Sequence, residues 1–286
     1  MQLPVRIIPR LDIKGPNLVK GIHLEGLRVL GKPEKFAKYY YEQGADELLY
    51  VDVVASLYQR NSLDDIIAQT AKNIFIPLTV AGGLRSIEDI KRVLRAGADK
   101  VAINTAAIHN PKLITQAANI FGSSTICISI EAIKQADGKY LAFTDNGREH
   151  TGLDVIEWAK QITQLGAGEI LLTSVDQEGT GKGYDIELTK NISDMVSIPI
   201  IACGGAGKLK HIVEVVNKAG ADAISLASML HYDFIQKHQT DFASKKEGNI
   251  EFLNSGCHYS IVDSVSINEI KKELVNNKIP CRITQT

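Results

Sequence analysis

The sequence predicts an α/β protein with the (β/α)8 TIM-barrel fold, formed by two similar half-barrels in one domain over residues 1–286. Two repeated blocks are the main evidence. "IPLTVAGG" (residues 76–83) recurs as "IPIIACGG" (198–205), and "GADKVAINTAA" (97–107) recurs as "GADAISLASML" (220–230). Because the blocks keep their order and shift by 122 and 123 residues, they indicate an internal duplication.

The same shift relates further segments, so that each half carries four short apolar runs. "RLDIK" around Asp12 corresponds to "SIEAIK" around Glu131, and "ELLYVDVVAS" (47–56) corresponds to "EILLTSVDQEG" (169–179). Nearly continuous apolar runs are typical of parallel strands that are buried on both faces. Helix-like stretches separate them, such as residues 86–99, which start with a capping pattern. An open doubly wound sheet is the alternative, but it explains the repeat less well.

Composition excludes several classes of function. The 286 residues include 32 basic and 33 acidic side chains, for a net charge of −1, so we expect no nucleic-acid partner. No run reaches the roughly 18 apolar residues of a membrane helix, and we see no signal peptide, so we expect no membrane partner and a cytoplasmic location. The four cysteines form no CxxC pair and are expected to be free thiols.

Polar residues and glycines follow the apolar runs, where barrel enzymes carry their active sites. The expected strand ends are, in chain order, Asp12, Asp52, Gly82-Gly83, Asn104-Thr105, Glu131, Thr173 with Asp176, Gly204-Gly205 and Ser228. The repeat places Asp12 and Glu131 on opposite sides of one mouth, where two carboxylates can divide acid and base chemistry. Alternatively, each acid caps the helix that follows it.

The two Gly-Gly pairs predict two phosphate sites at matched positions. A glycine pair lets the backbone approach a ligand, and the next helix offers N–H groups to a phosphate. Asn104, Thr105 and Ser228 add donors on neighbouring strands. Together they predict a long substrate with a phosphate at each end, although tight turns alone also require such glycines.

Four charged residues open strands at the other end of the predicted barrel: Arg6, Glu47, Lys100 and Glu169. If they are buried, they must pair with one another, because an unpaired buried charge is costly. Position alone slightly favours a solvated rim instead.

Several motifs closely resemble the cyclase subunit family of imidazole glycerol phosphate synthase, HisF. The resemblance runs from residue 6 to 232 and resumes from 266. The motifs are "LDIKG", "DELLYVDVVAS", "GADKVAINTAA", "GAGEILLTS", "DQEGTGKGYD" and "ACGGAGK".

This resemblance implies roles for individual residues. Asp12, Glu131 and Lys20, which lies on a mobile loop, would be catalytic. Phosphate or substrate would be bound by Gly83, Asn104, Thr105, Thr173, Gly179, Gly205 and Ser228. The four charged residues would form an ammonia gate, where a HisH-like glutaminase docks at the N-terminal face of the barrel. Since the chain has no GxCxG elbow of its own, the glutaminase must be a separate chain.

No cofactor and no metal are expected. Cys203, Cys257, His231 and His258 lack the spacing of metal ligands.

The chain departs from the family pattern near the predicted mouth. Glu131 stands where the histidine-pathway enzymes carry Asp, and Arg10 stands where a small residue or cysteine is usual. Pro16 stiffens the Lys20 loop, and Asp145-Asn146 replaces a more hydroxyl-rich pair. Residues 233–265 form an expected insertion between the eighth strand and a final helix that starts with the capping box of Ser266 and Glu269. The insertion either covers the mouth or decorates the surface.

These departures favour a branch of the family that installs an acetamidino group on a nucleotide-activated sugar in surface polysaccharide biosynthesis. The substrate would then be a nucleotide sugar. The alternative is the cyclase of histidine biosynthesis, acting on a small phosphorylated ribonucleotide. The related sugar-phosphate isomerase needs no ammonia gate, which counts against it. From another class, the barrel would be a non-catalytic, phosphate-binding activator of a glutaminase.

Overall fold

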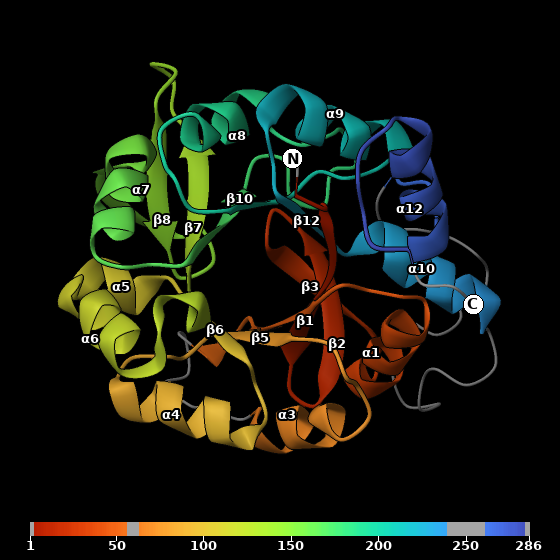
Figure 1. The fold of residues 1–286 in the computed structure, drawn as a ribbon, viewed down its shortest axis with the longest axis horizontal. Helices are drawn as coiled ribbons and strands as arrows, with labels where there is room; N and C mark the ends of the chain where they lie inside the picture. Colours follow the sequence, from red (N-terminus) through yellow and green to blue (C-terminus); the bar gives the residue numbers. More distant parts are fainter. Residues whose placement is uncertain (1–2, 56–62, 239–260, 284–286) are drawn as a thin grey trace.

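The structure is a computed structural model that describes residues 3–55, 63–238 and 261–283. Eight parallel strands close into a barrel surrounded by helices, which confirms the predicted TIM barrel (Figure 1). In order around the barrel the strands are β1 (Arg6–Lys14), β4 (Leu48–Asp52), β5 (Leu78–Ala81), β6 (Lys100–Ile103), β7 (Ile126–Lys134), β10 (Glu169–Ser174), β11 (Ile200–Cys203) and β12 (Ala223–Leu226), which pairs again with β1.

Helices form the outer layer. They are α1 (Pro33–Glu42), α3 (Asp64–Ala71), α4 (Ile87–Ala96), α5 (Thr105–His109), α6 (Lys112–Phe121), the 3-10 helix η1 (Ser123–Thr125), α7 (Val155–Gln164), α8 (Ile186–Ser193), α9 (Leu209–Ala219), α10 (Ser228–Lys237) and α12 (Ile267–Asn276). Both predicted caps are present. Ser86 accepts from the Asp89 amide at 3.2 Å, and Ser266 and Glu269 form the full capping box. In the described part of the chain, no helix is long and apolar enough to cross a membrane.

Two antiparallel hairpins extend the barrel at matched positions in its halves. β2 (Asn17–Ile22) and β3 (Glu25–Gly31) follow β1, while β8 (Tyr140–Thr144) and β9 (Glu149–Asp154) follow β7. Asp12 pairs with Val19 and Glu131 with Phe143, so neither acid ends its strand as expected. The reason is that the hairpins supply new partners beyond the barrel, so the backbone stays extended.

The ends of the other strands are close to expectation. β4, β5, β6 and β11 end at or directly before the predicted residues. Thr173 lies within β10 rather than at its end, and Ser228 is already the first residue of α10.

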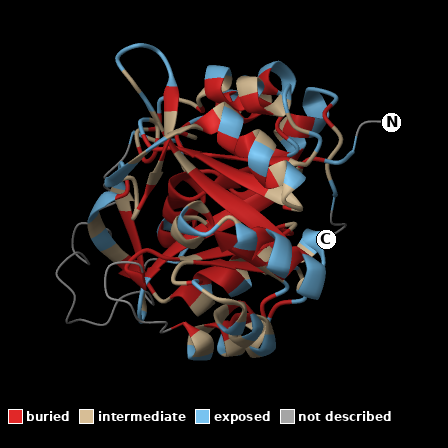
Figure 2. Cartoon of the chain, turned by 90° about the vertical axis from the view of Figure 1, so that its left-hand side faces the viewer, coloured by how far each residue is buried: buried red, intermediate tan, exposed pale blue. Residues whose placement is uncertain are grey.

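The core has two parts. The larger lies between the strands and the helices, and Figure 2 shows buried strands beneath half-buried helices. The smaller fills the barrel interior with Ile8, Leu49, Ala81, Ala102, Cys127, Leu171, Ile201, Cys203 and Ala223. The predicted insertion begins inside α10, which continues to Lys237, and residues 239–260 lie outside the described residues.

Candidate active site

Asp12 is a buried carboxylate on β1, held between two cations. Arg10 Nε lies 2.7 Å from Asp12 Oδ1, and Lys20 Nζ lies 3.5 Å from Oδ2. Burial alone would raise the pKa of Asp12, but the charges of Arg10 and Lys20 outweigh it and lower the pKa below its ordinary value. Asp12 therefore remains ionised at neutral pH.

Glu131 lies on β7, four strands from β1 in either direction around the barrel. Burial raises its pKa to about 7, although the Gly147 amide and the charge of Arg10 oppose the shift. Glu131 thus exchanges a proton near neutral pH while Asp12 does not. The two carboxylates therefore differ in pKa, as expected of a pair with different proton-transfer roles. Neither carboxylate caps a helix among the described caps, so the capping alternative is wrong.

Lys20 projects from β2 back over the mouth and forms an ion pair with Glu178. Burial lowers the pKa of Lys20, but the charges of Glu178 and Asp12 outweigh it and raise the pKa. His23 fixes the hairpin, donating its amide to the Glu178 carbonyl at 2.9 Å and placing Nδ1 2.8 Å from the Val175 carbonyl. From the sequence alone, no role is assigned to Glu178. Its position shortly after β10, at the mouth of the barrel, is the feature that could have identified it.

The larger cavity at the mouth has a volume of about 310 Å³ and lies over β4 to β7. Gly83, Asn104 and Thr105 line it together with Glu131, so the structure brings the first predicted phosphate site next to one carboxylate. Gly82 has φ +100°, and a Cβ there would lie 2.4 Å from the Asp52 carbonyl oxygen. The turn itself therefore requires glycine, whether or not it holds a ligand.

The second predicted phosphate site has little free space. Gly179, Gly205 and Ser228 line a cavity of about 20 Å³, which is roughly the space of one water molecule. Arg10, Lys20 and Glu178 also line it. Thr173 lines neither cavity and instead lies 3.5 Å from Arg10 Nη1, while Asp12 is covered by its two cations. The two sides of the mouth therefore differ in the space that they offer a ligand.

At the other end of the barrel, the four predicted charges form a closed ring. Arg6 lies 3.0 Å from Glu47 and 2.7 Å from Glu169, and Lys100 lies 3.0 Å and 2.9 Å from the same acids. Glu47 is only 2% exposed and also accepts from Thr79. The charges pair internally, while Arg6, Lys100 and Glu169 keep partial contact with solvent, at 26%, 18% and 12% side-chain exposure.

No cluster of three potential metal ligands occurs in residues 3–55, 63–238 and 261–283. Cys203 instead contacts Arg10 at 3.4 Å, and His231 lies 2.6 Å from the Tyr40 hydroxyl. Burial lowers the pKa of His231 to about 3, which keeps the imidazole neutral. Cys257 and His258 lie outside the described residues.

Comparisons with known proteins agree on one family. The profile of the family described as "Histidine biosynthesis protein" matches residues 6–236. "Imidazole glycerol phosphate synthase subunit HisF" of Legionella pneumophila is 62% identical over 206 residues, covering 72% of this chain and 97% of the relative. The protein of that name from Lactococcus lactis subsp. lactis is 44% identical over 282 residues, covering 98% and 97%. That of Methanococcus vannielii is 43% identical over 301 residues, covering 98% and 100%.

Proposed function

The chain belongs to the family of histidine biosynthesis proteins, and we propose that it is a HisF-type cyclase subunit of imidazole glycerol phosphate synthase. It would combine ammonia from a separate glutaminase with the open-chain histidine-pathway ribonucleotide. The products would be imidazole glycerol phosphate and aminoimidazole carboxamide ribonucleotide. The names of the relatives support this reaction better than the acetamidino-sugar reaction that the sequence departures favour.

The observation that carries the proposal is the unequal acidity of Asp12 and Glu131 on opposite strands of one mouth. When ammonia attacks an electrophilic carbon, the nitrogen must lose a proton, and a later step must return a proton to a leaving group. A group with a pKa of about 7 can do both at neutral pH. Asp12, held ionised between Arg10 and Lys20, keeps these two cations in place at the mouth.

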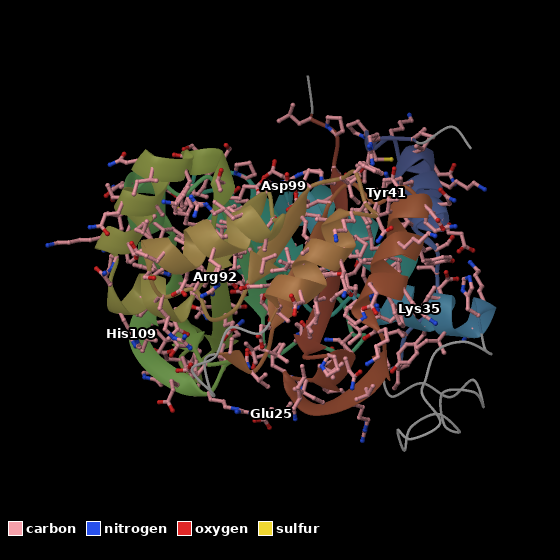
Figure 3. The ribbon with its side chains drawn as sticks, turned by 90° about the horizontal axis from the view of Figure 1, so that it is seen from below. Glu25, Lys35, Tyr41, Arg92, Asp99 and His109 are labelled. Atoms are coloured by element: carbon pink, nitrogen blue, oxygen red, sulfur yellow. The ribbon has the colours of Figure 1, made fainter. Side chains whose placement is uncertain are left out.

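Features at the opposite end of the barrel favour the binding of a partner chain. Among the described residues, six of the eight exposed large apolar side chains lie on segments at the end that carries the charged ring. They are Leu3, Phe75, Ile120, Met195, Val275 and Ile283. Figure 3 shows Tyr41 and Asp99 at this end, while Glu25 of the β2–β3 hairpin and His109 lie toward the other. Exposed apolar side chains at the end that carries a ring of charges fit a glutaminase that delivers ammonia into the barrel.

A turnover assay tests the proposal. The purified chain would be mixed with ammonium salt at mildly alkaline pH and the open-chain ribonucleotide, and imidazole glycerol phosphate would be measured. We expect turnover that falls by at least about a hundredfold in Asp12→Asn and in Glu131→Gln. Asp137→Asn, which changes an exposed acid on the β7–β8 turn, should leave turnover unchanged. No product from the unaltered chain would refute the proposal.

One observation favours the acetamidino reaction as a second candidate. Arg10 binds Asp12 and fills part of the space beneath the mouth, which alters the site relative to the family pattern. If the ribonucleotide is inert while the chain still binds a glutaminase, nucleotide-activated sugars become the substrates to assay. A non-catalytic activator would differ from both, because Asp12→Asn would leave glutaminase activation and every product level unchanged.

A further inference from the structure

Arg10 lies inside the barrel, between the apolar interior and the mouth. Its side chain starts on β1, and only 5% of the residue is exposed. Nε lies 2.7 Å from Asp12, while Nη1 lies 3.5 Å from Thr173 Oγ1 and 3.4 Å from Cys203 Sγ. The guanidinium therefore reaches from β1 to β10 and β11.

The strand that Arg10 crosses is β12, which offers small side chains to the interior. Ser225 pairs in register with Ile8 and with Cys203, and both of these belong to the interior cluster. Arg10, Cys203 and Ser225 all line the cavity of about 20 Å³. The β10–β12 side of the upper barrel is therefore filled by the guanidinium.

On the opposite side, the apolar interior borders the larger cavity directly. Ala81 and Ala102 belong to the interior cluster, and both also line the 310 Å³ cavity. Ser129 lies above them on β7, two residues before Glu131, and lines the same cavity. A small molecule that rises past the apolar interior thus enters the mouth beside Glu131.

We propose that Arg10 is a positioning residue that closes the barrel interior toward β10, β11 and β12 and directs ammonia to the cavity at Glu131. The inference rests on the proposed use of ammonia. Arg10 lowers the pKa of Asp12, so Asp12 is a poor proton acceptor. The proton that the attacking nitrogen loses therefore goes to Glu131, whose pKa is higher.

Three substitutions separate the size of Arg10 from its charge. Arg10→Met keeps an unbranched side chain that fills the inner part of the arginine's space without the charge, Arg10→Ala removes both, and Arg10→Lys keeps a cation. The chain would be assembled with the glutaminase subunit of the Legionella pneumophila synthase. Turnover would be measured with glutamine and separately with ammonium salt, which enters from solvent.

In Arg10→Ala we expect the ratio of glutamine-dependent to ammonium-dependent turnover to fall about tenfold, because ammonia escapes past β12. In Arg10→Met and Arg10→Lys the ratio should stay within about twofold of the unaltered complex. Arg148→Met, at a half-exposed arginine, is the matched control for charge removal. Equal ratios in the Ala and Met variants would overturn the proposal. If Arg10→Ala does not fold, Arg10→Val, which suits a strand, takes its place.

A second measurement uses the chain alone. Carboxylate NMR of Asp12 should show a higher pKa in Arg10→Met than in the unaltered chain and near-complete rescue in Arg10→Lys. An unchanged Asp12 pKa in Arg10→Met would contradict the inferred contact whatever the substrate. The unaltered complex could yield no imidazole glycerol phosphate while these pKa shifts are present. That result would refute the proposed function but leave the contact of Arg10 with Asp12 established.

Discussion

The backbone N–H of Gly147 donates a 2.8 Å hydrogen bond to Glu131 Oε2, which ties the turn between β8 and β9 to a carboxylate of the mouth. The two preceding residues, Asp145 and Asn146, have φ of 53° and 61°. Asn146 Nδ2 donates to the carbonyl of Val53, just beyond β4. The turn therefore crosses the larger cavity, and it consists of residue types that tolerate the left-handed conformation.

Asn146→Ala should loosen this turn. It removes the bond to Val53 and places alanine at a positive φ, so we expect a loss of about 1–2 kcal/mol in the local opening free energy. Hydrogen exchange at the Gly147 amide would report it. Asn146→Gly, which loses the bond but relaxes the backbone, should exchange more slowly than Asn146→Ala. The reverse order would contradict the role of the backbone conformation.

Glu131→Gln should stabilise the fold in a pH-dependent way. The folded-state pKa of Glu131 is raised from 4.5 to about 7, so this carboxyl favours the folded state below pH 4.5 and loses that contribution as pH rises through 7. At pH 8 the uncharged glutamine should therefore raise the free energy of unfolding by on the order of 1–3 kcal/mol, with little gain at pH 4.5. Urea unfolding at the two pH values measures the difference, and equal gains at both would count against the raised pKa.

Glu47→Gln should break the charged ring. The substitution leaves Arg6 and Lys100 facing each other with only Glu169 between them, and we expect a loss of about 2–4 kcal/mol in unfolding free energy. Glu169→Gln is the matched comparison. Its acid is more exposed, at 12% against 2% for Glu47, so solvent offsets more of the loss. A larger loss of unfolding free energy in Glu169→Gln than in Glu47→Gln would show that burial does not determine how much each acid stabilises the ring.

Asp145→Asn should strengthen anion binding in the larger cavity. Asp52, Glu131 and Asp145 all line it, and removing one negative charge lowers the repulsion of a phosphate. We expect the dissociation constant for inorganic phosphate to fall about two- to fivefold, measured by calorimetry with the chain alone. The effect should weaken in high salt. A salt-independent change would indicate a change in shape instead.

The repeated blocks predict the barrel well, because a duplication of strand and glycine segments constrains topology more strongly than any single propensity. The same logic places Arg6, Glu47, Lys100 and Glu169 at one end of the barrel, since strand starts meet there. Position alone favours a solvated rim and does not predict that the four charges pair with one another. The bond of Arg10 to Asp12 and the pairing of Lys20 with Glu178 were not predictable from spacing. Both depend on how a hairpin and a long side chain pack across strands that are distant in sequence.

Two hairpins cover the mouth, one for each half-barrel, and they carry different chemistry. The β2–β3 arm brings a lysine down onto β1 and the segment after β10, while the β8–β9 arm brings the Gly147 backbone amide onto β7 and the Asn146 side-chain amide onto the segment after β4. Each arm belongs to its own duplicated unit and makes its own contacts. Because each arm reaches from its own half-barrel to a strand end of the other, substitutions in one arm can change one side of the mouth while the contacts of the other arm stay in place. A duplicated barrel thus has two places at which a new substrate range can evolve.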